Sequence, residues 1–70
     1  MADVHVVPRG DQWACEVGGE RRSHHATQAE AIKRGGELAD QERGELVIHR
    51  ADGKIREKHS HGNDPRDVPG

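Results

Sequence analysis

The sequence predicts a single small α+β domain in the order ββ(β)αββ, with one helix packed on an antiparallel sheet of four or five strands. Three features carry this prediction. Short alternating segments stand at both ends of the chain, and one longer segment between them has helical spacing. Glycine-containing turns separate the short segments. Seventy residues allow one domain, which we place at residues 1–65, followed by a frayed tail at 66–70.

The first two strands are expected to form a hairpin. Val4–Pro8 is rich in β-branched residues and ends at a proline. In residues 13–17 (WACEV), the tryptophan, cysteine and valine alternate with other residues and therefore share one face. Gly18–Gly19 marks the next turn. The sequence leaves open whether the polar residues 21–25 add a third strand at an edge of the sheet.

The helix is predicted within the segment HATQAEAIKRGGELADQERG. Thr27 and Glu30 have the spacing of a capping box, in which the hydroxyl caps the first turn. Gly44 stands where a left-handed C-terminal cap is expected. Gly35 falls on the apolar stripe, and we interpret it as a close approach of the helix to the sheet. The stripe consists of Ala31, Ile32, Gly35, Leu38 and Ala39.

The last two strands are expected to form a second hairpin within GELVIHRADGKIREKHS. Asp52–Gly53 is typical of a two-residue turn, in which both positions favour positive φ. That turn pairs Arg50 with Ile55 and places Leu46, Ile48 and Ile55 on the buried face. A three-residue loop would shift the register by one and scatter these apolar residues, so burial favours the two-residue turn.

The predicted core is small, because 30% of the residues are hydrophobic, 34% are charged, and Trp13 is the only aromatic residue. A core of this size makes a partner or a second copy an attractive source of stability. The chain shows no signal-peptide pattern and no apolar run near eighteen residues, so we expect a soluble cytoplasmic protein without membrane contact. The predicted core residues are Val4, Val6, Trp13, Cys15, Val17, Ile32, Leu38, Leu46, Ile48 and Ile55.

Four segments together resemble the small prokaryotic family called domain of unknown function 2188: HVVPRGDQWACEV, TQAEAI, GELVIHRADGKIRE and GNDP. They occur in the family's order, and the resemblance extends from His5 to about Pro69. It implies an architecture and no chemistry, because the family has no assigned activity. Four positions depart from the expected pattern, which has an aliphatic residue at Cys15, an aromatic residue at His61 and alanine-like residues at Gly35–Gly36.

The residues argue against an enzyme. Cys15 is the only thiol, and its place in the alternation turns it inward, where a thiol is unreactive. Ser23 and Ser60 stand beside histidines, but neighbours on a strand point to opposite faces. Neither a phosphate-binding loop nor a dinucleotide fingerprint occurs. We therefore expect no cofactor and no small-molecule substrate.

A metal site is a distant alternative, raised by six histidines. Structural zinc usually takes four cysteine or histidine ligands in two close pairs. His24 and His25 are adjacent on a strand and diverge, whereas His59 and His61 share a face and would hold a transition ion only weakly. We predict no metal ligand set. The histidines are His5, His24, His25, His49, His59 and His61.

Protein interaction is the function that the sequence favours. Open edges in so small a sheet can pair with a protein partner or form a homodimer. The candidate contacts are Val47 on the outer sheet face and the turn residues Asn63 and Asp64.

Nucleic-acid binding is the alternative. Lys54, Arg56 and Lys58 are expected to alternate on the outer face with His49 beside them, and Arg21 or Arg22 extends this basic row. The net charge of −2 and the lack of aromatic residues for base stacking weigh against this function.

Overall fold

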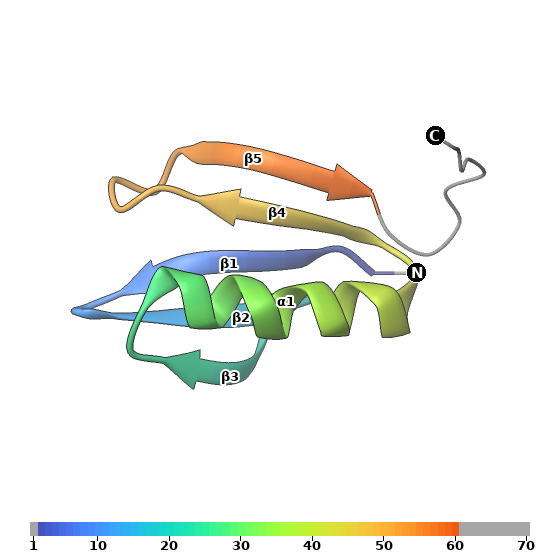
Figure 1. The fold of residues 1–70 in the computed structure, drawn as a ribbon, viewed down its shortest axis with the longest axis horizontal. Coiled ribbons are helices and arrows are strands. Elements are labelled where there is room, and N and C mark those ends of the chain that lie inside the picture. The colour runs from blue at the N-terminus through green and yellow to red at the C-terminus, as the bar shows by residue number, and fades with distance from the viewer. Residues whose placement is uncertain (1, 61–70) are drawn as a thin grey trace.

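The computed structural model describes residues 2–60, which form five strands and one helix in two layers (Figure 1). The α+β class and the single helix are confirmed, and residues 20–25 do form a strand. The elements are β1 (Val4–Arg9), β2 (Gln12–Val17), β3 (Glu20–His25), α1 (Gln28–Glu42), β4 (Glu45–His49) and β5 (Ile55–Ser60). No helix within residues 2–60 has the length and apolar character that a membrane span requires.

The sheet is mixed, so the prediction of an antiparallel sheet was wrong. Its strand order is β3-β2-β1-β4-β5, and β1 runs parallel to β4 while the other neighbours are antiparallel. The reason is the number of reversals in the chain. With β3 present, three strands and a helix precede β4, and each reverses direction, so β4 enters the sheet in the direction of β1. The helix supplies the long crossover that a parallel pair requires.

The helix covers most of one sheet face but not all of it. It packs on β1, β2, β3 and β4, whereas the backbone of β5 lies beyond its reach (Figure 1). The buried stripe of the helix contains Ala31, Gly35, Leu38 and Ala39.

Gly35 marks the close approach that the sequence predicted. A Cβ atom at this position would lie 2.8 Å from Leu46 Cδ1 and 3.0 Å from Val6 Cγ2. Such separations are below van der Waals contact, so α1 can approach β1 and β4 this closely only because residue 35 has no side chain.

The N-terminal cap is confirmed. Thr27 has extended backbone geometry, and its Oγ1 accepts a hydrogen bond from the Glu30 backbone N–H at 3.2 Å. This bond satisfies one of the four N–H groups that a helix start leaves without an intrahelical partner.

Replacing Thr27 with alanine is expected to lower the free energy of unfolding by about 1 kcal/mol, because Glu30 N–H loses its acceptor. Chemical denaturation of both proteins measures this difference. Thr27→Ser retains the hydroxyl and should recover most of the loss. A serine variant as unstable as the alanine variant would show that the Thr27 methyl group, and not the cap, is responsible.

The C-terminal cap differs from the prediction by one residue. Arg43, not Gly44, takes the left-handed conformation with φ 54°, and Gly44 N–H donates to Ala39 O at 3.2 Å. Gly44 is required for a different reason, since a Cβ atom there would overlap the carbonyl oxygen of Ala2. The glycine therefore serves packing against the N-terminal segment.

The turn of the second hairpin is longer than predicted. Arg50 N–H donates to Lys54 O at 2.7 Å, and Gly53 N–H donates to Arg50 O at 2.8 Å. Residues 51–53 therefore form a three-residue loop, in which Gly53 has φ 90°. Such loops often end in a residue with positive φ, which glycine adopts at little cost.

This loop changes the facing of β5. Ile55 lies opposite His49, and a bulge at Arg56 then places Glu57 opposite Ile48. Because Ile48 faces the core, Ile55 lies on the outer face of the sheet, away from the helix. The prediction that Ile55 pairs with Arg50 and faces the core was wrong.

Most of the other predicted core residues are buried. Trp13 and Ile32 are only half-buried against the core, and Ile55 is 52% exposed. The confirmed residues are Val4, Val6, Cys15, Val17, Leu38, Leu46 and Ile48.

Candidate interaction surface at the β5 edge

The last strand forms an open edge of the sheet. We call residues 55–60 the β5 edge. Every side chain from Ile55 to His59 is exposed, and Ile55 is the exposed large hydrophobic residue of the described chain. Within residues 2–60, β5 pairs with β4 on one side only, so every second residue on its other side presents an N–H and a C=O group that no described strand pairs with.

The pairing with β4 determines which β5 side chains share a face. Lys58 lies opposite Val47, and Ile55 lies opposite His49, so both belong to the outer face. Glu57 and His59 lie on the helix side, because their partners on β4 face the core. The outer face of the edge therefore combines one apolar side chain with one cation.

The charged side chains of this edge are held locally, with one exception. Arg56 Nη1 donates to Gln28 Oε1 at 3.0 Å, and Gln28 Nε2 donates to His49 O at 2.8 Å. His59 Nε2 and Glu57 Oε1 are 3.2 Å apart. Lys58 has no ion pair within residues 2–60.

The opposite edge, β3, is better protected. Between Cys15 and Glu16 its register with β2 shifts, which makes a bulge. Arg22 lies there and forms ion pairs with Glu20 at 3.7 Å and with Glu42 of α1 at 4.0 Å. Bulges and charged side chains discourage the addition of a further strand, and β5 has both as well. What distinguishes the two edges is that β3 packs against α1, which the backbone of β5 does not.

The predicted basic row does not exist as one surface. The Arg56 side chain instead forms a hydrogen bond with Gln28 on the first turn of α1. Lys54 lies at the end of the loop between β4 and β5. Lys58 alone stays on the outer face of the regular part of β5. The interruption follows from the bulge at Arg56, which shifts the alternation by one residue.

The remaining basic residues predicted for this surface lie elsewhere. Arg21 and Arg22 are on β3, four strand spacings from β5, or about 19 Å. Arg21 lies opposite Glu16. The ring of His49 contacts another histidine and a carbonyl group.

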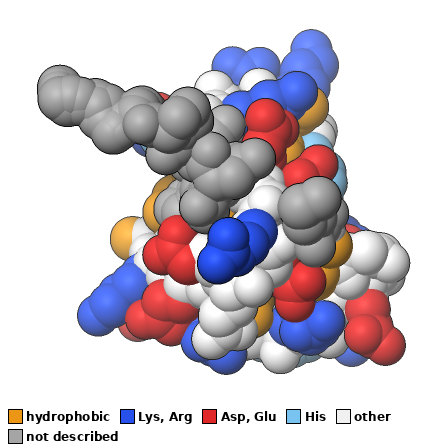
Figure 2. Space-filling model, turned by 90° about the vertical axis from the view of Figure 1, so that its right-hand side faces the viewer, with side chains coloured by type: hydrophobic (Ala, Val, Ile, Leu, Met, Phe, Trp, Pro, Cys, Tyr) orange, Lys and Arg blue, Asp and Glu red, His pale blue; other side chains and the backbone are white. Residues whose placement is uncertain are grey.

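Basic and acidic side chains also alternate at the end of the molecule that carries the C-terminus of α1. Figure 2 shows this end, where Lys and Arg side chains lie among Asp and Glu side chains. Among the described side chains of this view, both signs of charge are mixed.

The predicted partner contacts are also distributed differently. Val47 faces outward as expected, but it is only 3% exposed because His5 of β1 and Lys58 of β5 lie on either side of it. Its side chain therefore offers little surface to a partner. Asn63 and Asp64 lie outside the described residues.

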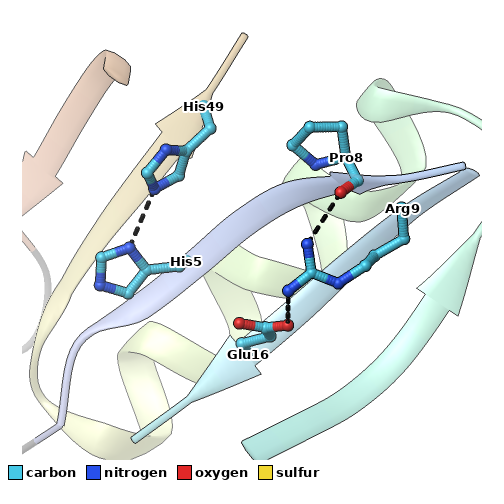
Figure 3. A network of polar contacts seen from close by, with 5 residues as sticks. All are labelled: His5, Pro8, Arg9, Glu16 and His49. Carbon is cyan, nitrogen blue, oxygen red and sulfur yellow. Dashed lines mark hydrogen bonds and ion pairs between the residues drawn. The ribbon is translucent and has the colours of Figure 1, made fainter. Parts of the chain in front are cut away.

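Polar contacts on the outer face join β1 to both of its neighbours (Figure 3). His5 Nδ1 lies 3.0 Å from His49 Nε2, and Arg9 donates to Glu16 Oε2 at 2.7 Å. The two histidines are 44 positions apart, and only the parallel pairing of β1 with β4 brings them together. Sequence reasoning missed this pair because it assumed an antiparallel sheet.

The nucleophilic side chains Cys15 and Ser23 stand opposite each other on β2 and β3. Cys15 is fully buried, its Sγ donates to Ala31 O, and burial raises the pKa of the thiol. Ser23 Oγ lies 2.9 Å from His25 Nε2, a same-face pair that sequence reasoning about adjacent residues overlooked. No carboxylate contacts His25 within residues 2–60, and in the same range no three potential metal ligands gather at one point.

Comparison with known proteins places the chain in a family and gives no activity. No curated protein and no solved structure matches it. One family model matches residues 4–61, which include all five strands and the helix. The chain therefore belongs to the family described as "Uncharacterized protein conserved in bacteria (DUF2188)".

Proposed function

We propose that this domain is a non-enzymatic binding module that takes up an extended segment of another protein at the β5 edge. The added segment becomes a sixth strand of the sheet. The observation that supports this proposal is the exposure of β5, which among the described residues has a strand on one side only and is not covered by α1. Backbone hydrogen bonds supply the affinity in this mode of recognition, and alternate side chains supply the specificity.

The charges of β5 favour a foreign strand over a second copy of the chain. In a symmetric antiparallel pair, one residue lies opposite its own copy. Centred on Arg56, Glu57 or Lys58, such a pair opposes two like charges, which is destabilising. Centred on His59, it pairs only residues 58–60 of the described chain. Centred on Ile55, it pairs the two isoleucines but also places Lys54 opposite Arg56, which are again like charges. Self-association is therefore the weaker alternative.

The side chains on the outer face of the β5 edge determine which residues a partner strand should carry opposite them. Ile55 and Lys58 are neighbours on this face although they are three positions apart, because the bulge inserts Arg56 as an extra residue between them. A complementary strand carries an apolar residue opposite Ile55 and an acidic residue opposite Lys58, and these two partner residues are two positions apart.

The acetylated and amidated peptide TDTVTT meets this requirement. Titrating it into ¹⁵N-labelled protein is expected to shift amide signals of residues 55–60 and of β4, and to leave β3 unchanged. Lys58→Glu is expected to weaken binding about fivefold, the equivalent of about 1 kcal/mol. Lys33→Glu, an exposed position on α1, makes the same charge change and should leave the affinity unchanged.

Two controls decide whether the contact is a strand addition. The same peptide, methylated at the alternate backbone nitrogens whose N–H groups face β5, keeps its charge but loses these donors, and it should not bind. Shifts at β3, or equal binding of the methylated peptide, would contradict the proposal. So would shifts that appear only with a single-stranded oligonucleotide at low salt, which would instead favour the nucleic-acid alternative.

A further inference from the structure

The hydrogen bonds of the His49 ring determine which of its two nitrogens carries the proton in its contact with His5. The ring centroids are 5.3 Å apart with an angle of 33° between the ring planes, and the nearest nitrogens, His5 Nδ1 and His49 Nε2, are 3.0 Å apart (Figure 3). His49 Nδ1 lies 3.0 Å from the carbonyl oxygen of Gly53. A carbonyl oxygen only accepts, so His49 Nδ1 carries a proton.

This assignment fixes the character of the other nitrogen. In the neutral ring, His49 Nε2 holds a lone pair, and it is directed at His5. A ring that donates Nδ1–H to a backbone carbonyl and presents a lone pair at Nε2 is the usual state of a metal-ligating histidine, because the carbonyl fixes the tautomer and orients the ring.

The separation of the two nitrogens is close to that found around a metal ion. Nitrogens bound to one tetrahedral zinc ion at about 2.05 Å lie about 3.3 Å apart. The observed 3.0 Å therefore requires a widening of only a few tenths of an ångström, together with rotation of the rings so that both lone pairs converge. In the described residues, the His5 ring is held by His49 alone and can make this rotation.

We propose that His5 and His49 form a two-histidine site for a divalent transition ion of the class that prefers imidazole, such as Zn²⁺, Ni²⁺ or Cu²⁺. Water molecules complete the coordination, because both rings are half-buried on the outer face of the sheet. On binding, the proton between the rings leaves His5 Nδ1 and is taken by His5 Nε2 or by solvent. Glu16 lies opposite His5 across the β1–β2 pair, but its carboxylate is held by Arg9, and we do not include it among the ligands.

The site has a structural consequence. His5 belongs to β1 and His49 to β4, and the junction between these strands joins the β1–β3 part of the sheet to the second hairpin. An ion bound by both strands stabilises the folded state over the unfolded state, so the melting temperature should rise with ion concentration.

The test is a Zn²⁺ titration of the full chain without an affinity tag, followed by calorimetry and by the melting temperature. We expect one equivalent to bind and the melting temperature to rise. His5→Gln and His49→Gln should each lower the affinity at least tenfold, whereas the double variant His59→Gln/His61→Gln should leave it unchanged. Loss of binding in the double variant, or no loss in His5→Gln, would overturn the proposal.

A second readout does not depend on the stability of the variants. Substoichiometric Ni²⁺ is expected to broaden the ring signals of His5 and His49 in the unmodified protein before those of His24 and His59. Broadening that begins at His59 would place the ion elsewhere and contradict the assignment.

Discussion

Replacing Ile48 with alanine is expected to lower the free energy of unfolding by about 2–5 kcal/mol, whereas the same change at Ile55 should cost less than about 0.5 kcal/mol. Ile48 is 1% exposed and lies in the core, so its removal leaves a cavity. Ile55 is 52% exposed on the outer face of β5, so its removal leaves none. Urea denaturation of the two variants measures both values.

The comparison is a direct test of the hairpin register. Under the two-residue turn that the sequence predicts, both isoleucines face the core, and both variants should be strongly destabilised. Equal losses at the two positions would therefore contradict the three-residue loop and the bulge at Arg56. The chemical change is the same in both variants, so the difference reports only their surroundings.

Replacing Gly35 with alanine is expected to destabilise the domain by up to about 2 kcal/mol. The new methyl group meets Leu46 Cδ1 and Val6 Cγ2 at 2.8 and 3.0 Å, and overpacking of this kind costs about 1–3 kcal/mol. Alanine recovers up to about 1 kcal/mol through its better helix propensity. The balance is a net loss, which thermal or urea denaturation will measure.

Gly36→Ala is the matched control, since it makes the same change one residue later and outside the buried stripe of α1. Because Gly36 lies outside the buried stripe, the gain in helix propensity is expected to dominate, and the domain should become more stable by up to about 1 kcal/mol. A Gly35→Ala variant as stable as Gly36→Ala would show that α1 does not approach the sheet as closely as described.

Local features of the fold were predictable because they depend on neighbouring residues. The helix cap by the Thr27 hydroxyl and the alternation that turns Cys15 inward both follow from the spacing of a few residues. Gly35 was also interpreted correctly, because a glycine on the apolar stripe lowers helix propensity and is tolerated there when the missing side chain lets the helix pack closely.

The strand directions were not predictable in the same way. The direction of β4 relative to β1 depends on whether β3 exists, because each additional strand reverses the chain once more. Residues 20–25 carry no apolar signal that decides this, and they are held in the sheet by pairing with β2 and by ion pairs of Arg22. Because the sequence left this strand open, it did not reveal the parallel pair or, with it, the contact of His5 with His49.

The prediction of which β5 side chains face the core was wrong because of how the helix packs on the sheet. Burial of Ile55 was the argument for the two-residue turn, but α1 does not extend over β5, so no core exists there to bury it. Gly53 adopts positive φ at the end of a longer loop instead. The predicted basic row of Lys54, Arg56 and Lys58 depended on the same register and was lost with it.

The openness of the β5 edge is the central claim, and amide hydrogen exchange of residues 57–60 tests it most directly. We expect alternate amides to exchange quickly in the free protein at every protein concentration, while their neighbours are protected by pairing with β4. Addition of the TDTVTT peptide should protect the fast amides. Full protection of all four amides without peptide, or no added protection with it, would contradict the claim.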